Sequence, residues 1–154
     1  MDLHEPPQVS RLRHHRSVKL AMEVLSSKAY QEALDWLRDH FTFNFNQQIE
    51  WSGDPDVATG EISDLNEPRL LHLLQAYGVE PSRQVTILWA YGDIGMKLPV
   101  SLVAKYINDI WLPVNDDVFL FDMKDVWCLE LHHEGAFSCG RYYPSHYEKL
   151  SKPA

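Results

Sequence analysis

The stretch at residues 117–142, DVFLFDMKDVWCLELHHEGAFSCGRY, decides the fold because it contains three apolar runs separated by short turns. The runs at 117–122, 126–133 and 136–142 have the length of β-strands. The connections between them, of three and two residues, have the lengths of tight hairpin turns. Strands joined by such turns pair antiparallel. This stretch therefore predicts a three-stranded antiparallel sheet.

Upstream of this stretch, apolar residues repeat at helical spacing in three segments. These segments are residues 17–38, with a candidate break at Ser26, and residues 67–77 and 100–111. Residues 84–91 are instead apolar on both faces, as in a strand that is covered on two sides. The alternation of helices and strands predicts helices packed on a sheet.

Residues 41–51 show a two-residue alternation and predict a further strand. Residues 57–65, whose alternation is weak, are a candidate for another short strand. We predict an α+β fold in which one domain, residues 1–154, packs a mainly antiparallel sheet against about three helices. Residues 1–16 are predicted to be flexible or loosely packed. The predicted core consists of Trp89, Ile107, Trp111, Phe119, Phe121, Leu129 and Leu131.

The charge of the chain is unevenly distributed. The 154 residues carry a net charge of −8, but residues 32–134 hold 18 acidic and six basic residues, a net charge of −12. Such a segment repels nucleic-acid phosphates and attracts basic surfaces. No apolar run approaches the roughly 20 residues that span a bilayer, and the first residues lack the pattern of a secretion signal. We therefore expect a cytoplasmic protein that binds neither nucleic acid nor a membrane.

The two cysteines are predicted to be free thiols. With a two-residue turn at 134–135, Cys128 and Cys139 are diagonal neighbours on one sheet face, about 7–8 Å apart and beyond the usual reach of a disulfide. Two cysteines in a chain of this length also do not make the disulfide framework of a small secreted domain. A reducing compartment agrees with both arguments.

The same register places Glu130, His132 and Arg141 on one face, where they are candidates for the acid–base groups of a small enzyme. His132 and His133 are successive strand residues that point to opposite faces, so they do not form a metal site by themselves. The sequence also lacks the G-x-G-x-x-G, G-x-x-x-x-G-K-[ST], G-x-S-x-G and H-E-x-x-H motifs. No cofactor or metal ion is therefore predicted.

Four segments of the C-terminal half carry a family resemblance. They are YINDIW at 106–111, NDDVFLFD at 115–122, WCLELHHE at 127–134 and FSCGR at 137–141. These segments resemble small bacterial immunity proteins of polymorphic toxin systems, of the Rhs and contact-dependent-inhibition type. Fainter similarity at 60–65 and 68–71 extends the resemblance over residues 60–141.

The resemblance implies an immunity protein: a cytoplasmic, stoichiometric inhibitor that binds and neutralises the C-terminal domain of a cognate toxin. Such toxins include basic nucleases, with which the acidic middle segment is compatible. We predict that the contact is made by exposed acidic residues at strand ends and turns. These are Asp116, Asp117, Asp122, Asp125 and Glu134. Two other classes stay open: a small enzyme that uses Glu130, His132 and Arg141, and a ligand-binding or adaptor module.

Overall fold

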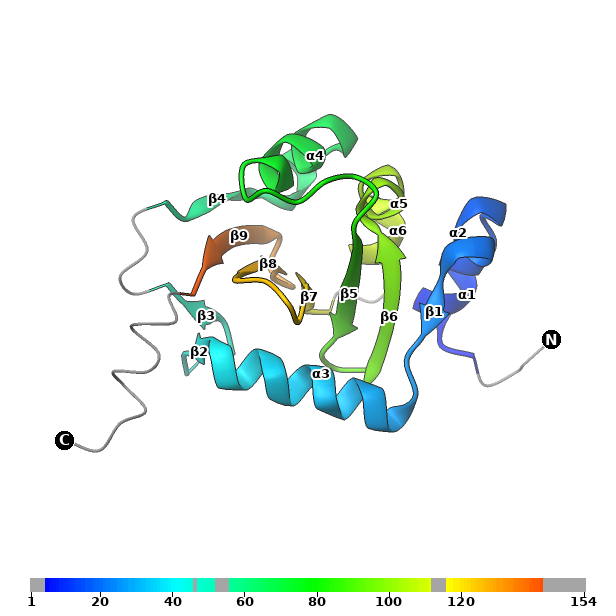
Figure 1. Ribbon diagram of the computed structural model, residues 1–154, viewed down its shortest axis with the longest axis horizontal. Coiled ribbons are helices and arrows are strands. Elements are labelled where there is room, and N and C mark those ends of the chain that lie inside the picture. Colours follow the sequence, from blue (N-terminus) through cyan, green and yellow to red (C-terminus); the bar gives the residue numbers. More distant parts are fainter. Residues whose placement is uncertain (1–4, 46, 52–55, 112–115, 143–154) are drawn as a thin grey trace.

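A seven-stranded antiparallel sheet forms the centre of the computed structural model, which describes residues 5–45, 47–51, 56–111 and 116–142 (Figure 1). The strands are β1 (Glu23–Val24), β4 (Ala58–Glu61), β5 (Gln84–Trp89), β6 (Ile94–Pro99), β7 (Val118–Phe121), β8 (Trp127–Leu131) and β9 (Ala136–Arg141). Their order across the sheet is β1-β6-β5-β7-β8-β9-β4, and each neighbouring pair is antiparallel. The predicted α+β class is confirmed.

The predicted helices exist, and two of them are divided. The helices are α1 (Pro7–Arg13), α2 (Arg16–Ala21), α3 (Ser27–His40), α4 (Glu67–Gln75), α5 (Val100–Lys105) and α6 (Ile107–Trp111), and a 3₁₀ turn, η1, covers Ile62–Asp64. Ser26 caps the N-terminus of α3, because its Oγ accepts a hydrogen bond from the Ala29 amide at 3.1 Å. Among the described residues, no helix has the length and apolar character needed to cross a membrane.

Residues 41–51 form a short hairpin where the sequence predicts one strand. Its strands are β2 (Thr42–Phe43) and β3 (Ile49–Glu50). Gln47 has a φ of 64°, a turn conformation, and its amide donates to the Asn44 carbonyl at 3.0 Å. The turn therefore divides the alternating segment into two paired pieces.

The prediction of a loosely packed N-terminal segment is wrong for the part of it that is described. Residues 5–16 include α1, where Val9 and Leu12 are buried one helical turn apart and join the core. α1 contacts α2 and α6. Two apolar residues are too few to show a period in the sequence, although they are enough to anchor a short helix. Residues 1–4 lie outside the described residues.

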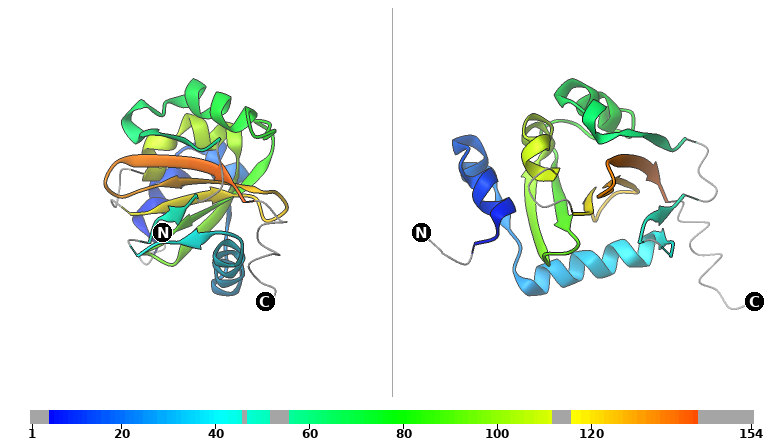
Figure 2. Two further views of the ribbon diagram at one scale, coloured as in Figure 1. Left: turned by 90° about the vertical axis from the view of Figure 1, so that its left-hand side faces the viewer. Right: turned by 180° about the vertical axis from the view of Figure 1, so that it is seen from behind.

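The sheet is covered on both faces (Figure 2). One face of the sheet, which we call the α3 face, is covered by α3 and the β2–β3 hairpin. The opposite face is covered by α4, α5 and α6. Two apolar cores result, one on each side of the sheet. Of the seven predicted core residues, Trp111 is partly buried and the other six are buried. The buried six are Trp89, Ile107, Phe119, Phe121, Leu129 and Leu131.

The register of the β8–β9 hairpin differs by one residue from the prediction. Leu131 pairs with Phe137, and the His132 amide donates to the Ala136 carbonyl at 2.8 Å. The loop therefore has three residues, 133–135, and ends at Gly135 with a φ of +100°, a conformation that glycine adopts easily. A slip of one residue moves every β9 side chain to the opposite face of the sheet.

This slip separates residues that the sequence analysis grouped. Cys128 belongs to the core on the α3 face and Cys139 to the opposite core, so they are not diagonal neighbours. The guanidinium of Arg141 lies 4.9 Å from the ring centre of Tyr77, on the face opposite to Glu130. The predicted grouping of Arg141 with Glu130 and His132 is therefore wrong.

Both cysteines are nevertheless free, as predicted, and both are buried. Because the sheet separates their side chains, we expect no disulfide to form between them in the folded protein. Alkylation without reductant, followed by mass spectrometry, should label both thiols in denaturant and neither in the native protein. A peptide that joins Cys128 to Cys139 would contradict the observed register.

Candidate functional site

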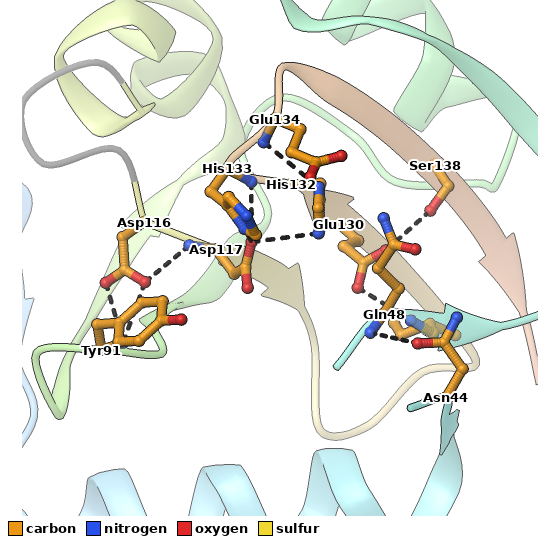
Figure 3. Close-up of polar contacts among 11 residues, drawn as sticks. Asn44, Gln48, Tyr91, Asp116, Asp117, Glu130, His132, His133, Glu134 and Ser138 are labelled. Carbon is orange, nitrogen blue, oxygen red and sulfur yellow. Dashed lines mark hydrogen bonds and ion pairs between the residues drawn. The ribbon is translucent and has the colours of Figure 1, made fainter. Parts of the chain in front are cut away.

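A cluster of polar side chains lies on the α3 face where β7 begins and β8 ends (Figure 3). Val118 pairs with Leu131, so Asp117, which precedes Val118, reaches His132, which follows Leu131. Asp117, His132 and His133 each offer a ligand atom within 4.8 Å of the others. Strand pairing therefore assembles this cluster from two separate segments.

Asp117 holds the loop between β8 and β9. Its Oδ1 accepts the His133 amide at 2.8 Å and lies 2.9 Å from Nδ1 of the same histidine. The hydrogen bond to Asp117 raises the pKa of His133, because it favours the protonated ring. One buried carboxylate thus fixes both the backbone and the side chain of His133.

His132 is the buried member of the cluster. Its side chain is 6% exposed, and its Nδ1 accepts the Glu134 amide at 3.3 Å. Its Nε2 lies 3.9 Å from Oδ1 of Asp117, too far for a hydrogen bond, and has no hydrogen-bond partner among the described residues. The rings of His132 and His133 are 4.1 Å apart between centroids, so the prediction that they point to opposite faces is wrong. His133 lies beyond the end of β8, where the alternation of a strand no longer applies.

Glu130 lies on the same face, two residues before His132. Its Oε2 accepts the Ile49 amide at 3.0 Å and its Oε1 accepts the Ser138 hydroxyl at 3.3 Å. Nε1 of Trp51 donates a hydrogen bond to Oγ of the same Ser138 at 2.9 Å. Burial is the main cause that raises the pKa of Glu130 to about 7. Glu130 and His132 both line a cavity of about 470 Å³ between the sheet and the β2–β3 hairpin.

The predicted set of partner-binding residues is not one exposed cluster. Asp116 and Asp117 are 2% and 5% exposed. Asp116 accepts the amides of Tyr91 at 3.0 Å and Asp117 at 2.7 Å, and burial raises its pKa. Both carboxylates therefore satisfy buried groups of the fold, and the prediction that they are exposed is wrong.

The other three predicted residues occupy two ends of the sheet. Asp122 lies at the β7–β8 turn, where it accepts from Nε of Arg83 at 2.6 Å, and Asp125 accepts the Val126 amide at 2.8 Å in the same turn. Glu134 is exposed in the β8–β9 loop, beyond the opposite end of these strands. Of the five predicted residues, Glu134 alone is exposed and also forms no ion pair in the described chain.

Three further acidic residues lie in the segment that packs beside this loop. β4 is an edge strand that pairs with β9, and the Ile62 amide donates to the Gly135 carbonyl at 2.8 Å. We call the resulting set the acidic edge; its members are Glu61, Asp64, Glu67 and Glu134. All four are exposed, and none forms an ion pair within residues 5–142 as far as these are described. Sequence reasoning missed the first three because they belong to a segment distant from the hairpin turns.

Neither protein families nor curated proteins identify a relative of this chain. No known protein family matches the chain, and no curated protein matches it significantly.

Proposed function

We propose that this chain is an immunity protein, a cytoplasmic inhibitor that binds a basic toxin domain in a one-to-one complex. The observation that carries the proposal is the acidic edge, whose exposed carboxylates have no ion-pair partner in the described chain. Unpaired carboxylates on a fixed backbone attract a basic partner from a distance of about one Debye length, ~8 Å at physiological salt.

The scaffold under the acidic edge supports this role. Asp117 fixes His133 by two contacts and thereby positions Glu134, the next residue. β4 carries Glu61 and is fixed by its pairing with β9. A backbone that is already held in place loses little conformational entropy on binding, which favours affinity. Asp116 and Asp117 are therefore proposed to support the contact and not to make it.

The enzyme alternative loses one of its residues. It needs Glu130, His132 and Arg141 together, and Arg141 lies across the sheet on Tyr77. The remaining pair, Glu130 and His132, borders a cavity, which is compatible with binding a group of the partner. Inhibition by binding does not require Arg141 to lie beside Glu130 and His132.

The test neutralises three residues of the acidic edge, Glu61→Gln, Asp64→Asn and Glu134→Gln, which preserve side-chain size. We expect the association rate with the toxin domain encoded beside the gene to fall about tenfold at low salt. The dependence of that rate on salt should weaken, because fewer charges steer the encounter. Stopped-flow measurements over a series of salt concentrations give both quantities.

A matched control changes the net charge by the same amount elsewhere. Glu32→Gln, Asp39→Asn and Glu80→Gln are also exposed positions, and two of them lie on α3. The control should associate faster than the acidic-edge variant. Equal rates for the two variants would contradict a role of the acidic edge. Failure of the wild-type chain to restore growth or to co-purify when co-expressed with the toxin domain would contradict the inhibitor function itself.

A further inference from the structure

We propose that Asp117, His132 and His133 form a binding site for a divalent transition-metal ion, with Zn²⁺ as the preferred ion. The three side chains bring one carboxylate and two imidazoles to one point, with all ligand atoms within 4.8 Å of each other. Two imidazole nitrogens select zinc and related ions over Mg²⁺ and Ca²⁺, which prefer oxygen ligands. This site adjoins Glu134 of the acidic edge but uses other side chains, and the proposal does not depend on the inhibitor function.

The distances between the donor atoms suit a tetrahedral ion. Zinc binds imidazole nitrogen and carboxylate oxygen at about 2.0–2.2 Å, so its tetrahedral ligands lie about 3.4 Å apart. Oδ1 of Asp117 lies 2.9 Å from Nδ1 of His133 and 3.9 Å from Nε2 of His132. These two separations lie on either side of the tetrahedral value, and all three ligand atoms lie within 4.8 Å of one another, so the side chains must move closer together to hold an ion.

A second, independent observation points to a missing ligand. Nε2 of His132 is buried and has no hydrogen-bond partner among the described residues, yet it is directed at Asp117 (Figure 3). A buried polar atom without a partner is unfavourable, and a bound ion would satisfy it. His132 therefore has an open position where the proposed ion would bind.

Binding requires His133 to release to solvent the proton that its Nδ1 donates to Asp117, and it requires a defined change in His132. Its Nδ1 now accepts the Glu134 amide, so the neutral ring carries its proton on Nε2. An ion at Nε2 requires that the proton be held by Nδ1 instead, which gives up one long hydrogen bond of 3.3 Å. Glu134 is exposed in the loop, so water can take the place of that bond. Metal binding should therefore convert one tautomer of His132 into the other.

The site has three protein ligands and a fourth position for water or a partner group. The ring of His132 lines the cavity of about 470 Å³, and Asp117 lines a second cavity of about 210 Å³. His133 is partly exposed and gives access from solvent. An ion here would connect the start of β7 to the β8–β9 loop.

The test titrates the metal-free full chain with Zn²⁺ against a chromophoric chelator. We expect one site per chain, and we expect both His133→Ala and Asp117→Asn to weaken it by at least about 10-fold. His133 is partly exposed, so its truncation should not unfold the protein. Asn at position 117 keeps an oxygen that can accept the His133 amide. The matched control is His72→Ala, which removes an exposed histidine of α4 and should leave the affinity unchanged.

A second measurement follows His132 directly. Long-range ¹H–¹⁵N correlation spectra should show Nε2 of His132 protonated without metal, and Nδ1 protonated with Nε2 bound once Zn²⁺ is added. The proposal is overturned if no stoichiometric site is found. It is equally overturned if both site variants bind like the His72→Ala control, or if Zn²⁺ leaves the His132 ring signals unchanged.

Discussion

Replacing Trp89 with alanine is expected to lower the free energy of unfolding by about 3–5 kcal/mol, measured by urea denaturation. The side chain is 0% exposed in β5, at the centre of the sheet. Its Nε1 donates to the Ile110 carbonyl at 2.8 Å and so connects the sheet to α6. The substitution removes a large apolar group, leaves a cavity and leaves that carbonyl without its donor. A domain of this size has a total stability of about 5–15 kcal/mol, so the loss is a large fraction of it.

The control lies two residues further along the chain. Tyr91 is 80% exposed, and its Ala variant keeps the backbone amide that Asp116 accepts. We expect Tyr91→Ala to change stability by no more than about 0.5 kcal/mol. Leu129→Ala, in the same core as Trp89, should cost about 2–5 kcal/mol. Losses below about 1 kcal/mol at both Trp89 and Leu129 would contradict the placement of this core.

The apolar pattern was enough to predict the strands that form the centre of the sheet. Four strands lie within predicted segments: β5, β7, β8 and β9. Each contains a run of residues whose side chains are buried on one or both faces of the sheet. The helix α4 was equally predictable, since Asn66 caps it and Gly78, with a φ of +78°, follows its end. Local chemistry specifies these elements without help from the rest of the chain.

Elements that depend on distant partners could not be predicted in the same way. β6 contains Gly95 and Lys97 within its six residues, which interrupt the apolar run. It forms because β5 and β1 supply hydrogen-bonding partners on its two sides. Tertiary context overrides a weak strand preference in such a case.

The register of β8 and β9 was the error with the widest consequences. Two-residue and three-residue loops both accept glycine near their end, so the sequence at Glu134-Gly135 is compatible with either length. The observed three-residue loop exchanges the neighbours of Glu130, which pairs with Ser138 instead of Cys139. A difference of one loop residue thus changed every predicted contact on that face.

The candidate site was predictable in part. Glu130 and His132 were expected on one sheet face, but Asp117 was assigned to the exposed acidic set, so its proximity to His132 was not predicted. The burial of Asp116 and Asp117 did not follow, because aspartate near a turn is usually exposed. Both are buried because backbone amides of residues 91, 117 and 133 need acceptors there.

Glu130 has a buried carboxyl group whose charge the fold disfavours. It is 4% exposed, and no lysine or arginine forms an ion pair with it in the described chain. Its pKa is raised from 4.5 to about 7, mainly by burial and further by the nearby charge of Asp117. The folded state therefore prefers Glu130 protonated, whereas the unfolded chain ionises it near pH 4.5.

The resulting prediction is a loss of stability as pH rises from about 4.5 to 7. Below pH 4.5 Glu130 is protonated in both states and contributes no difference. Between the two pKa values the unfolded state releases the proton first and is favoured, and above pH 7 the loss reaches a plateau of about 3 kcal/mol. Glu130→Gln mimics the protonated form, because its amide can accept from Ile49 and donate to Ser138. We expect this variant to be more stable than wild type by up to about 3 kcal/mol at pH 8, and nearly equal at pH 4.5.

Comparing the two proteins by urea denaturation at each pH isolates Glu130, because every other titrating group is common to both. The measurement is made with a chelator present, so that no ion at the neighbouring histidines contributes. Glu32→Gln is the matched control: it makes the same chemical change at an exposed position of α3, so its stability difference from wild type should not depend on pH. A difference between Glu130→Gln and wild type that stays constant from pH 4.5 to 8 would mean that Glu130 is ionised at no greater cost in the folded protein than in the unfolded chain. In that case water must reach the carboxylate through the cavity beside Trp51, and the cavity would be a hydrated channel to the polar cluster.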